Sequence, residues 1–433
     1  MLLLDVVTNW VSLQQTQWMK RSSLLELQTR RLRETVDDAC SKVPFYQKLY
    51  QAAGIDADAI ECAKDIEKFP TINKTQLRAV PLQERTARDI KLKECRVHIT
   101  SGSIPTGMKL MVLDDPYSAA VSDALKLRLL WAYGARPFHK LVRLRHAIED
   151  ADAQLKVVDR RGLWALARSK WTRELSYDTD LNEHLQLLRK WKADVLMAAT
   201  PYCKALARLT ETTGKNLSFK VVVTSAVLLD DSTRKLISDK FNAEVYDHYG
   251  TEEAGGSLAW ECPSHSGYHL NSETHFLEFL SNGRPVEAGE PGEVHVTTFR
   301  RLATPIIRYS VGDIAVPIED ECSCGRGLPL IKEIQGRTAD YIATKAGRYI
   351  SPITVMRSLN AAYGVDQFKV TQQGDRSIEV YIVTRQDDTE SVRKDVECCC
   401  QHLFGETPFE VHLVDRIENS ESRKFRSVES HIA

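Results

Sequence analysis

The sequence lacks any hydrophobic run that reaches the roughly 18 residues a membrane-spanning helix needs. Its first residues have no basic segment and meet Asp5 early, so they do not predict a secretory signal peptide. Net charge is nearly absent as well, with 58 Lys and Arg against 59 Asp and Glu. No overall basic field therefore indicates nucleic acid as a partner. We expect neither a membrane protein nor a nucleic-acid-binding one.

The cysteine content points to a compartment. Ten cysteines in 433 residues, without a secretory signal, indicate reducing conditions in which thiols act as ligands or core residues. A cytoplasmic protein is the expectation. Apolar residues make up 43% of the chain and aromatic residues 8%, which is typical of a globular protein. The length predicts roughly two or three domains, and we find no internal repeat.

Hydrophobic periodicity divides the chain into two parts. In the first part, helical spacing and short β-branched runs alternate, which predicts an α/β fold with largely parallel sheets. The helices are expected at 22–40, 123–132 and 180–191, and the strands at 194–197, 220–224, 244–246 and 293–298. After Gly336 and Arg337 the pattern changes to a compact unit of about one hundred residues, a typical small domain. Its strands are expected at 367–371, 378–383 and 410–414, and its helices at 354–362 and 389–402.

The segment from Arg96 to Asp115 combines the patterns of two phosphate loops. Four residues separate Gly102 from Gly107, as in a Walker A loop, but no Lys and hydroxyl residue follow the second glycine. The apolar residues after this loop predict a strand, so the segment is expected to be a hairpin. Small residues in such a loop still allow backbone N–H groups to converge on phosphate. An ordinary polar hairpin loop is the alternative.

Four further stretches bear on this choice. They are VYDHYGTEEAG (Val245–Gly255), TPIIRYSVGDIA (Thr304–Ala315), IQGRTADYIATKAGRYISP (Ile334–Pro352) and SESRKFRSV (Ser420–Val428). Together with Thr100–Gly107, in this order, they resemble the adenylate-forming enzymes of the phenylacetate–CoA ligase branch. SKVPFYQKLY (Ser41–Tyr50) resembles the N-terminal region of that branch. The resemblance implies an enzyme that uses ATP to convert a carboxylic acid, usually aryl or arylacetic, into an acyl-adenylate and then transfers the acyl group to CoA.

The resemblance also implies an architecture. Residues 1–338 would form a large domain of helices around β-sheets, which binds ATP and the acid. Residues 339–433 would form a small mobile α+β domain, joined by a hinge at Asp340. The resemblance leaves open whether the chain forms a homodimer.

Site residues follow from the same resemblance. The ATP phosphates would be bound by a loop containing Ser101, Gly102, Ser103, Thr106 and Gly107. In the YGTE stretch, Tyr249 and Gly250 would lie against adenine, Thr251 would donate to the α-phosphate or the carboxylate, and Glu252 would bind Mg²⁺, which prefers oxygen ligands. Asp313 would accept from the ribose hydroxyls, and Arg337 would bind ribose or phosphate. Lys424 would offset the negative charge that develops between carboxylate and α-phosphate.

Two departures from the family pattern keep other functions open. Ile104 and Pro105 form a two-residue insertion in the phosphate loop, and Val227 stands where relatives commonly place Glu near adenine. One alternative is an adenylating ligase whose acceptor is an amine, a hydroxyl or a carrier-protein thiol. Another is a degenerate homologue that binds a nucleotide without turnover.

A second candidate site is a metal site. Cys262 and His265 form a Cys-x₂-His pair, and Cys322 and Cys324 form a Cys-x-Cys pair, each in a loop rich in small residues. Three thiolates and one imidazole predict a closed, structural zinc site. His269 is the substitute for His265. The run of Cys398, Cys399 and Cys400 is not expected to bind one metal, because successive side chains on a helix point about 100° apart.

Overall fold

The computed structural model describes the whole chain except residues 1, 101–109, 146–170, 178, 418–425 and 433. The predicted phosphate-loop residues and Lys424 therefore lie outside the described residues. The helices are α1 Leu2–Thr16, α2 Arg21–Lys42, α3 Pro44–Ala53, α4 Lys74–Ala79, α5 Pro116–Ala132, α7 Leu181–Trp191, α8 Thr200–Thr213, α9 Asp231–Phe241, α10 Pro352–Ala361 and α11 Thr389–Phe404. No helix within these ranges is long and apolar enough to cross a membrane.

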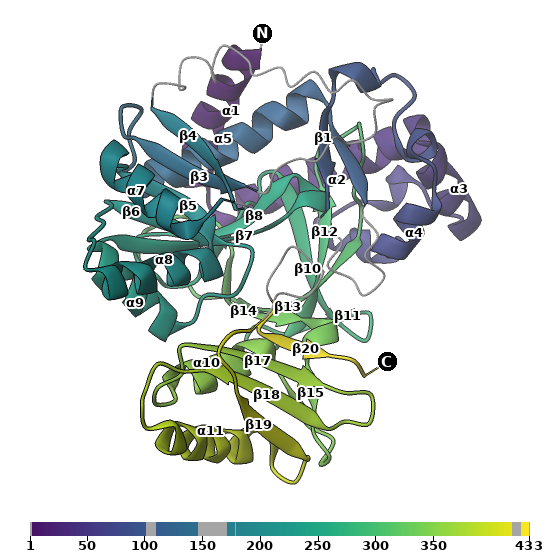
Figure 1. Ribbon diagram of the computed structural model, residues 1–433. Helices are drawn as coiled ribbons and strands as arrows, with labels where there is room; N and C mark the ends of the chain where they lie inside the picture. Colours follow the sequence, from purple (N-terminus) through teal and green to yellow (C-terminus); the bar gives the residue numbers. More distant parts are fainter. Residues whose placement is uncertain (1, 101–109, 146–170, 178, 418–425, 433) are drawn as a thin grey trace.

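Twelve strands form one large mixed sheet in the order β11-β10-β12-β13-β14-β9-β8-β7-β6-β5-β3-β4 (Figure 1). Its strands are β3 Leu141–Arg145, β4 Thr172–Ser176, β5 Val195–Ala199, β6 Val221–Ser225, β7 Glu244–Thr251, β8 Gly256–Glu261, β9 Tyr268–Leu270, β10 His275–Ser281, β11 Arg284–Pro285, β12 Gly292–Thr298, β13 Tyr309–Ile318 and β14 Leu330–Arg337. A separate hairpin pairs β1 Arg96–Ile99 with β2 Met111–Asp114, as the sequence predicts for the strands that flank the phosphate loop.

The parallel part of this sheet is buried on both faces. In β6, Val222 packs with Leu206 and Ile237 of α8 and α9, whereas Val221 and Val223 pack on the opposite face with residues of α2 and α5. Such two-sided burial explains why this strand is continuously apolar. The expectation of largely parallel sheets is nevertheless wrong for the rest of the sheet. Strands β3 to β7 pair in parallel, but β7 to β14 are joined by antiparallel pairs.

The C-terminal part has its own sheet and its own hydrophobic core, and lies below the large sheet in Figure 1. Its four-stranded sheet has the order β19-β18-β17-β20, and β15 and β16 form a small hairpin. These strands are β15 Ile342–Ala343, β16 Tyr349–Ile350, β17 Gln367–Gln372, β18 Ile378–Val383, β19 Phe409–Leu413 and β20 Val428–Ser430. Helices α10 and α11 contribute Leu359 and Val396 to its core. The structure thus has the predicted two-domain architecture.

Candidate nucleotide site and thiol cluster

The stretch YGTE stands at the end of β7, where the chain turns back into β8. Gly250 is required there, because a Cβ added to it would lie 1.7 Å from the carbonyl oxygen of Gly256. The turn continues through a short 3₁₀ helix, Glu252–Ala254, and Gly255 follows with a left-handed φ of 83°. This tight turn constrains the backbone conformation on both sides of Thr251 and Glu252.

Tyr249, Asp313 and Arg337 come from three different strands and meet at this turn. The hydroxyl of Tyr249 donates to Oδ2 of Asp313 at 2.9 Å, and Nε of Arg337 lies 3.8 Å from Oδ1 of the same carboxylate. Asp313 and Arg337 are register partners in β13 and β14. Burial, and then the charge of Asp313, raise the pKa of Tyr249 well above its usual range, so the phenol stays neutral. Three residues predicted from separate motifs are therefore brought together.

Thr251 and Glu252 point to different partners. Thr251 donates a short hydrogen bond to the carboxylate of Glu253, which also pairs with Lys74 at 3.1 Å. Glu253 is buried. Glu252 is 58% exposed, which leaves its carboxylate accessible to a ligand.

His98 connects the phosphate-loop hairpin to Glu252. Its Nδ1 lies 2.8 Å from Oε2 of Glu252, and its Nε2 lies 2.8 Å from Oδ2 of Asp114. Burial alone would lower the pKa of His98, but the hydrogen bonds to the two carboxylates outweigh burial and raise it. The hydrogen bond from His98 in turn lowers the pKa of Glu252 to about 2. Arg301, 2.7 Å from Asp114, helps to hold the pKa of that buried carboxyl below its usual range despite the opposing effect of burial.

Sequence analysis missed this network. His98 lies two residues before the Ser/Thr/Gly loop, which begins at Thr100, and Asp114 ends the strand after it, but a single His or Asp in a strand carries no signal of its own. The only available signal was the predicted hairpin, which places residues 98 and 114 on adjacent strands. Lys74 and Arg301 come from segments that no motif covered.

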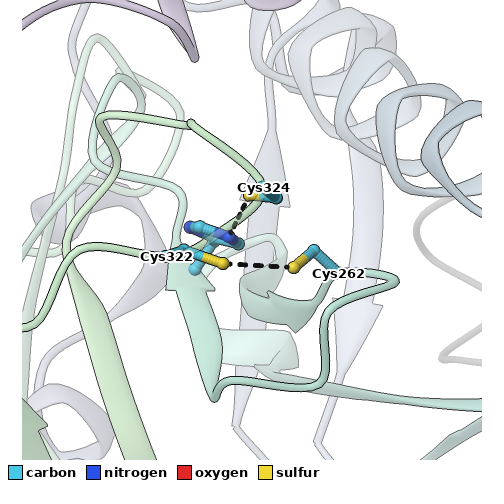
Figure 2. Close-up of side chains that lie close together, drawn as sticks. Cys262, Cys322 and Cys324 are labelled. Atoms are coloured by element: carbon cyan, nitrogen blue, oxygen red, sulfur yellow. Dashed lines mark hydrogen bonds between the residues drawn. The ribbon is translucent and has the colours of Figure 1, made fainter.

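Three cysteines from two loops converge beside the large sheet (Figure 2). The sulfur atoms of Cys262 and Cys322 are 3.5 Å apart, and that of Cys324 lies 3.3 Å from Nε2 of His269. A separation of 3.5 Å is far longer than a disulfide bond, and all ten cysteines are free thiols. The four ligand atoms lie within 4.8 Å of one another.

The histidine of this cluster is His269, so the choice of His265 is wrong. His265 occupies a turn with a left-handed φ of 50°, and its ring stacks on Tyr246 with centroids 5.1 Å apart. Its Nδ1 faces Glu261 at 3.7 Å instead of the thiols. His269, in β9, is fully buried and directed at Cys324. Spacing alone could not distinguish the two, because both histidines follow Cys262 within a few residues.

The donor set fits zinc. Three thiols and one imidazole in a buried cluster make the closed tetrahedral set that structural zinc sites use. The loop that carries Cys322 and Cys324 also contacts the N-terminal region: the N–H of Gly327 donates to the carbonyl of Gln17 at 3.0 Å, and the guanidinium of Arg326 lies 4.8 Å from the ring of Trp18. A metal here would join this loop to β8 and β9.

Comparison with known proteins gives relatives of one kind. No family model matches the chain. A phenylacetate–coenzyme A ligase of Thermus thermophilus is 27% identical over 341 residues, which are 75% of this chain and 72% of that protein. The enzyme of the same name from Escherichia coli K12 is 27% identical over 340 residues, 74% of this chain and 72% of that protein.

Solved structures share the fold. A 2-hydroxyisobutyryl-CoA ligase in the postadenylation state, in complex with an acyl-AMP, has a TM-score of 0.80 at 19% identity, over 96% of this chain and 90% of that one. The same enzyme in its thioesterification state has a TM-score of 0.65 at 20% identity, over 95% and 91% of the two chains. The ordered motifs and the sequence relatives agree in their likeness to the phenylacetate–CoA ligase-like branch of the adenylate-forming superfamily, and the solved ligase structures share this two-domain fold.

Proposed function

We propose that the chain activates a carboxylic acid with ATP and transfers the acyl group to CoA. In the first step a carboxylate oxygen attacks the α-phosphorus, which forms an acyl-adenylate and releases pyrophosphate. In the second step the CoA thiol attacks the acyl carbon, which forms the thioester and releases AMP. An aryl or arylacetic acid is the proposed substrate, because the sequence relatives are phenylacetate–CoA ligases.

One observation carries this proposal: residues from motifs far apart in the sequence meet at the end of β7. The contacts join Tyr249 to Asp313, Asp313 to Arg337, and Glu252 to the hairpin that flanks the predicted phosphate loop. In our proposal, Tyr249 and Gly250 lie against adenine, Asp313 accepts from the ribose hydroxyls, and Arg337 binds ribose or phosphate. A structural network would not need a stacking ring, a ribose acceptor and a cation at one turn.

The remaining roles concern charge. Glu252, exposed and held as a carboxylate by its low pKa, would bind the Mg²⁺ of Mg·ATP. Thr251 would donate to the α-phosphate or to the acid. Ser101, Gly102, Ser103, Thr106 and Gly107 would bind phosphate, and Lys424 would stabilise the charge of the first transition state. These last six residues lie outside the described residues, so their roles rest on the family resemblance alone.

Three further proposals concern domain motion, a structural metal and the location of the protein. The small domain, residues 339–433, would rotate about a hinge at Asp340 between the two half-reactions. Zinc would bind Cys262, His269, Cys322 and Cys324 and serve structure alone, because four protein ligands leave no position for water or substrate. Ten free thiols support a cytoplasmic location, since disulfides are rare in reducing compartments.

The experiment that tests the reaction is ATP–pyrophosphate exchange with a panel of aromatic, arylacetic and short aliphatic acids. Exchange that depends on one acid class, followed by thioester formation on addition of CoA, is the expected result. Exchange without thioester would favour an amine, hydroxyl or carrier-protein acceptor. ATP binding without exchange for any acid would reject the proposal in favour of a degenerate nucleotide-binding protein. Asp313→Ala serves as the control and should lose exchange.

A further inference from the structure

His98 lies between an exposed carboxylate and a buried one. The His98 side chain is 15% exposed, Glu252 is 58% exposed, and Asp114 is 1% exposed. His98 and Asp114 belong to the same antiparallel hairpin, where His98 pairs with Val112, two residues before Asp114. This diagonal placement on one face is within reach of long side chains. The imidazole is therefore fixed from inside the protein and directed towards the turn that carries Glu252.

Asp114, the buried partner of His98, is itself held in place by Arg301. Nε of Arg301 lies 2.7 Å from Oδ1 of Asp114, and Arg301 also donates a short hydrogen bond to the carbonyl of Glu253. Arg301 and Asp114 are both almost fully buried. Arg301 thus ties the hairpin to the backbone of the turn immediately after Glu252. The guanidinium of Arg301 therefore contacts both Asp114, the buried partner of His98, and the backbone next to Glu252, its exposed partner.

Glu252, the exposed partner of His98, keeps one carboxylate oxygen for a ligand. His98 contacts Oε2 of Glu252, and no described contact involves Oε1. Carboxylates that ligate metals are themselves commonly oriented by hydrogen bonds from a second residue, and such partners influence metal affinity by 10- to 100-fold. A hydrogen bond to Oε2 would reduce the rotation of a long, exposed side chain that otherwise loses rotamer entropy on binding.

We propose that His98 is a positioning residue that holds the Glu252 carboxylate in the orientation that ligates the Mg²⁺ of bound Mg·ATP. Asp114 and Arg301 orient the imidazole and do not touch the nucleotide. The inference rests on the proposed role of Glu252 in Mg·ATP binding. It assigns to the strand before the phosphate loop a part in orienting the metal ligand.

Two substitutions separate the two contacts of His98. The amide nitrogen of Asn superimposes on Nδ1 of His, and that of Gln superimposes on Nε2. His98→Asn therefore retains a donor towards Glu252, whereas His98→Gln retains one towards Asp114 and loses the contact with Glu252. Both variants keep a polar side chain at this half-buried position, which guards against unfolding. Glu252→Gln is the reference for loss of the metal ligand.

The experiment measures ATP binding by calorimetry on the full chain, once in EDTA and once across a MgCl₂ titration, so that no acid substrate is needed. We expect Mg²⁺ to strengthen ATP binding by the wild type. In His98→Gln the Mg²⁺ concentration at half effect should rise about 10-fold, and in His98→Asn much less. Binding in EDTA should be equal for all variants. The double variant His98→Gln/Glu252→Gln should be no weaker than Glu252→Gln alone, because the two residues act as one unit.

Three results would overturn the inference: unchanged Mg²⁺ dependence in His98→Gln, effects of His98→Gln and Glu252→Gln that add, or a wild type whose ATP binding ignores Mg²⁺. The first two leave the proposed function intact. Failure of ATP–pyrophosphate exchange with every acid, while the predicted Mg²⁺ dependence holds, would instead reject the proposed reaction and support the role of His98.

Discussion

At the scale of single residues, the chain keeps several buried carboxylates whose hydrogen bonds act against the effect of burial on their pKa. Asp247, in β7 two residues before Tyr249, is the clearest case. It is buried and accepts hydrogen bonds from Thr224 at 2.6 Å and from Tyr268 at 2.9 Å. Burial, and then the nearby carboxylate of Glu261, raise the pKa of Asp247 from 3.8 to about 6. The hydrogen bonds reduce this rise without abolishing it.

Asp247→Asn should therefore change the pH dependence of stability. The folded chain holds the Asp247 proton more tightly than the unfolded chain, so the ionised carboxylate destabilises the fold above about pH 6. This penalty, on the order of 3 kcal/mol, disappears as the pH falls below about 4. Urea unfolding of both proteins should show the variant gaining stability over the wild type on going from pH 5 to pH 8. A difference that stays constant between these pH values would mean that Asp247 does not titrate in this range.

Residue roles were predictable where a motif carried them and not elsewhere. Tyr249, Asp313 and Arg337 could be predicted together because each belongs to a stretch that resembles the family, and the structure joins all three. His98 was missed because its importance lies in its contacts with Glu252 and Asp114, which no local pattern encodes. His269 was only a substitute for the same reason: the spacing of the two histidines after Cys262 does not show that His265 lies in a left-handed turn and faces Glu261.

At the scale of elements, the thiol cluster lies where loops of two strand pairs, β8 with β9 and β13 with β14, come into contact. Cys262 follows β8, His269 lies in β9, and Cys322 and Cys324 lie in the loop between β13 and β14. Among the described residues, one short antiparallel pairing, β14 with β9, joins the β8–β9 pair to the β13–β14 pair within the sheet. A bound zinc would reinforce this narrow junction and keep the Cys322–Gly327 loop against Gln17 and Trp18.

Purified protein should contain about one zinc per chain by elemental analysis. Cys322→Ser and His269→Ala should lose the metal and lower the melting temperature by roughly 5 °C or more, because metal binding of this kind contributes to folding free energy. His265→Ala and the exposed Cys398→Ser are matched controls that should keep both zinc and stability. Metal-free wild-type protein, or His265→Ala losing zinc while His269→Ala retains it, would refute the assigned ligand set.

The elements themselves were predicted well from sequence, but their pairing was not. Helix α7 and strand β6 lie within a residue or two of their expected ranges, because periodicity and β-branched runs are local properties. The antiparallel arrangement of β8 to β14 depends on which distant strands meet, and alternation of helices with strands is informative only for the first half of the sheet. Local patterns therefore specified the elements and left half of the sheet topology open.

At the scale of the whole molecule, several contacts between the two domains are polar. Asn360 of α10 accepts from Lys204 and donates to Asp230, both at 2.8 Å, and Arg208 lies 3.4 Å from Asp366. Polar interfaces of this kind separate more easily than hydrophobic ones. Within the small domain, close to the proposed hinge, Arg426 forms a short ion pair with the buried Asp340. Contacts of this kind would permit the proposed rotation of the small domain.

Lys424 should matter for one half-reaction only. It stands two residues before Arg426, in the Lys-Phe-Arg sequence that resembles the family's adenylation lysine. If the small domain rotates about Asp340, this lysine serves acyl-adenylate formation and leaves before CoA attacks. Lys424→Ala should slow acyl-adenylate formation by about 10²-fold or more, the scale that follows removal of one charge-stabilising donor. Thioester formation from chemically supplied acyl-adenylate should remain close to wild type, as rapid-quench measurements of the two steps can establish.

Lys394→Ala, on the exposed face of α11, is the control for loss of a lysine from the same domain. Equal rates of acyl-adenylate formation in Lys424→Ala and wild type would mean that the resemblance at residues 420–428 does not extend to function. Equal slowing of both steps would instead argue against rotation, because a residue that leaves between steps cannot serve both.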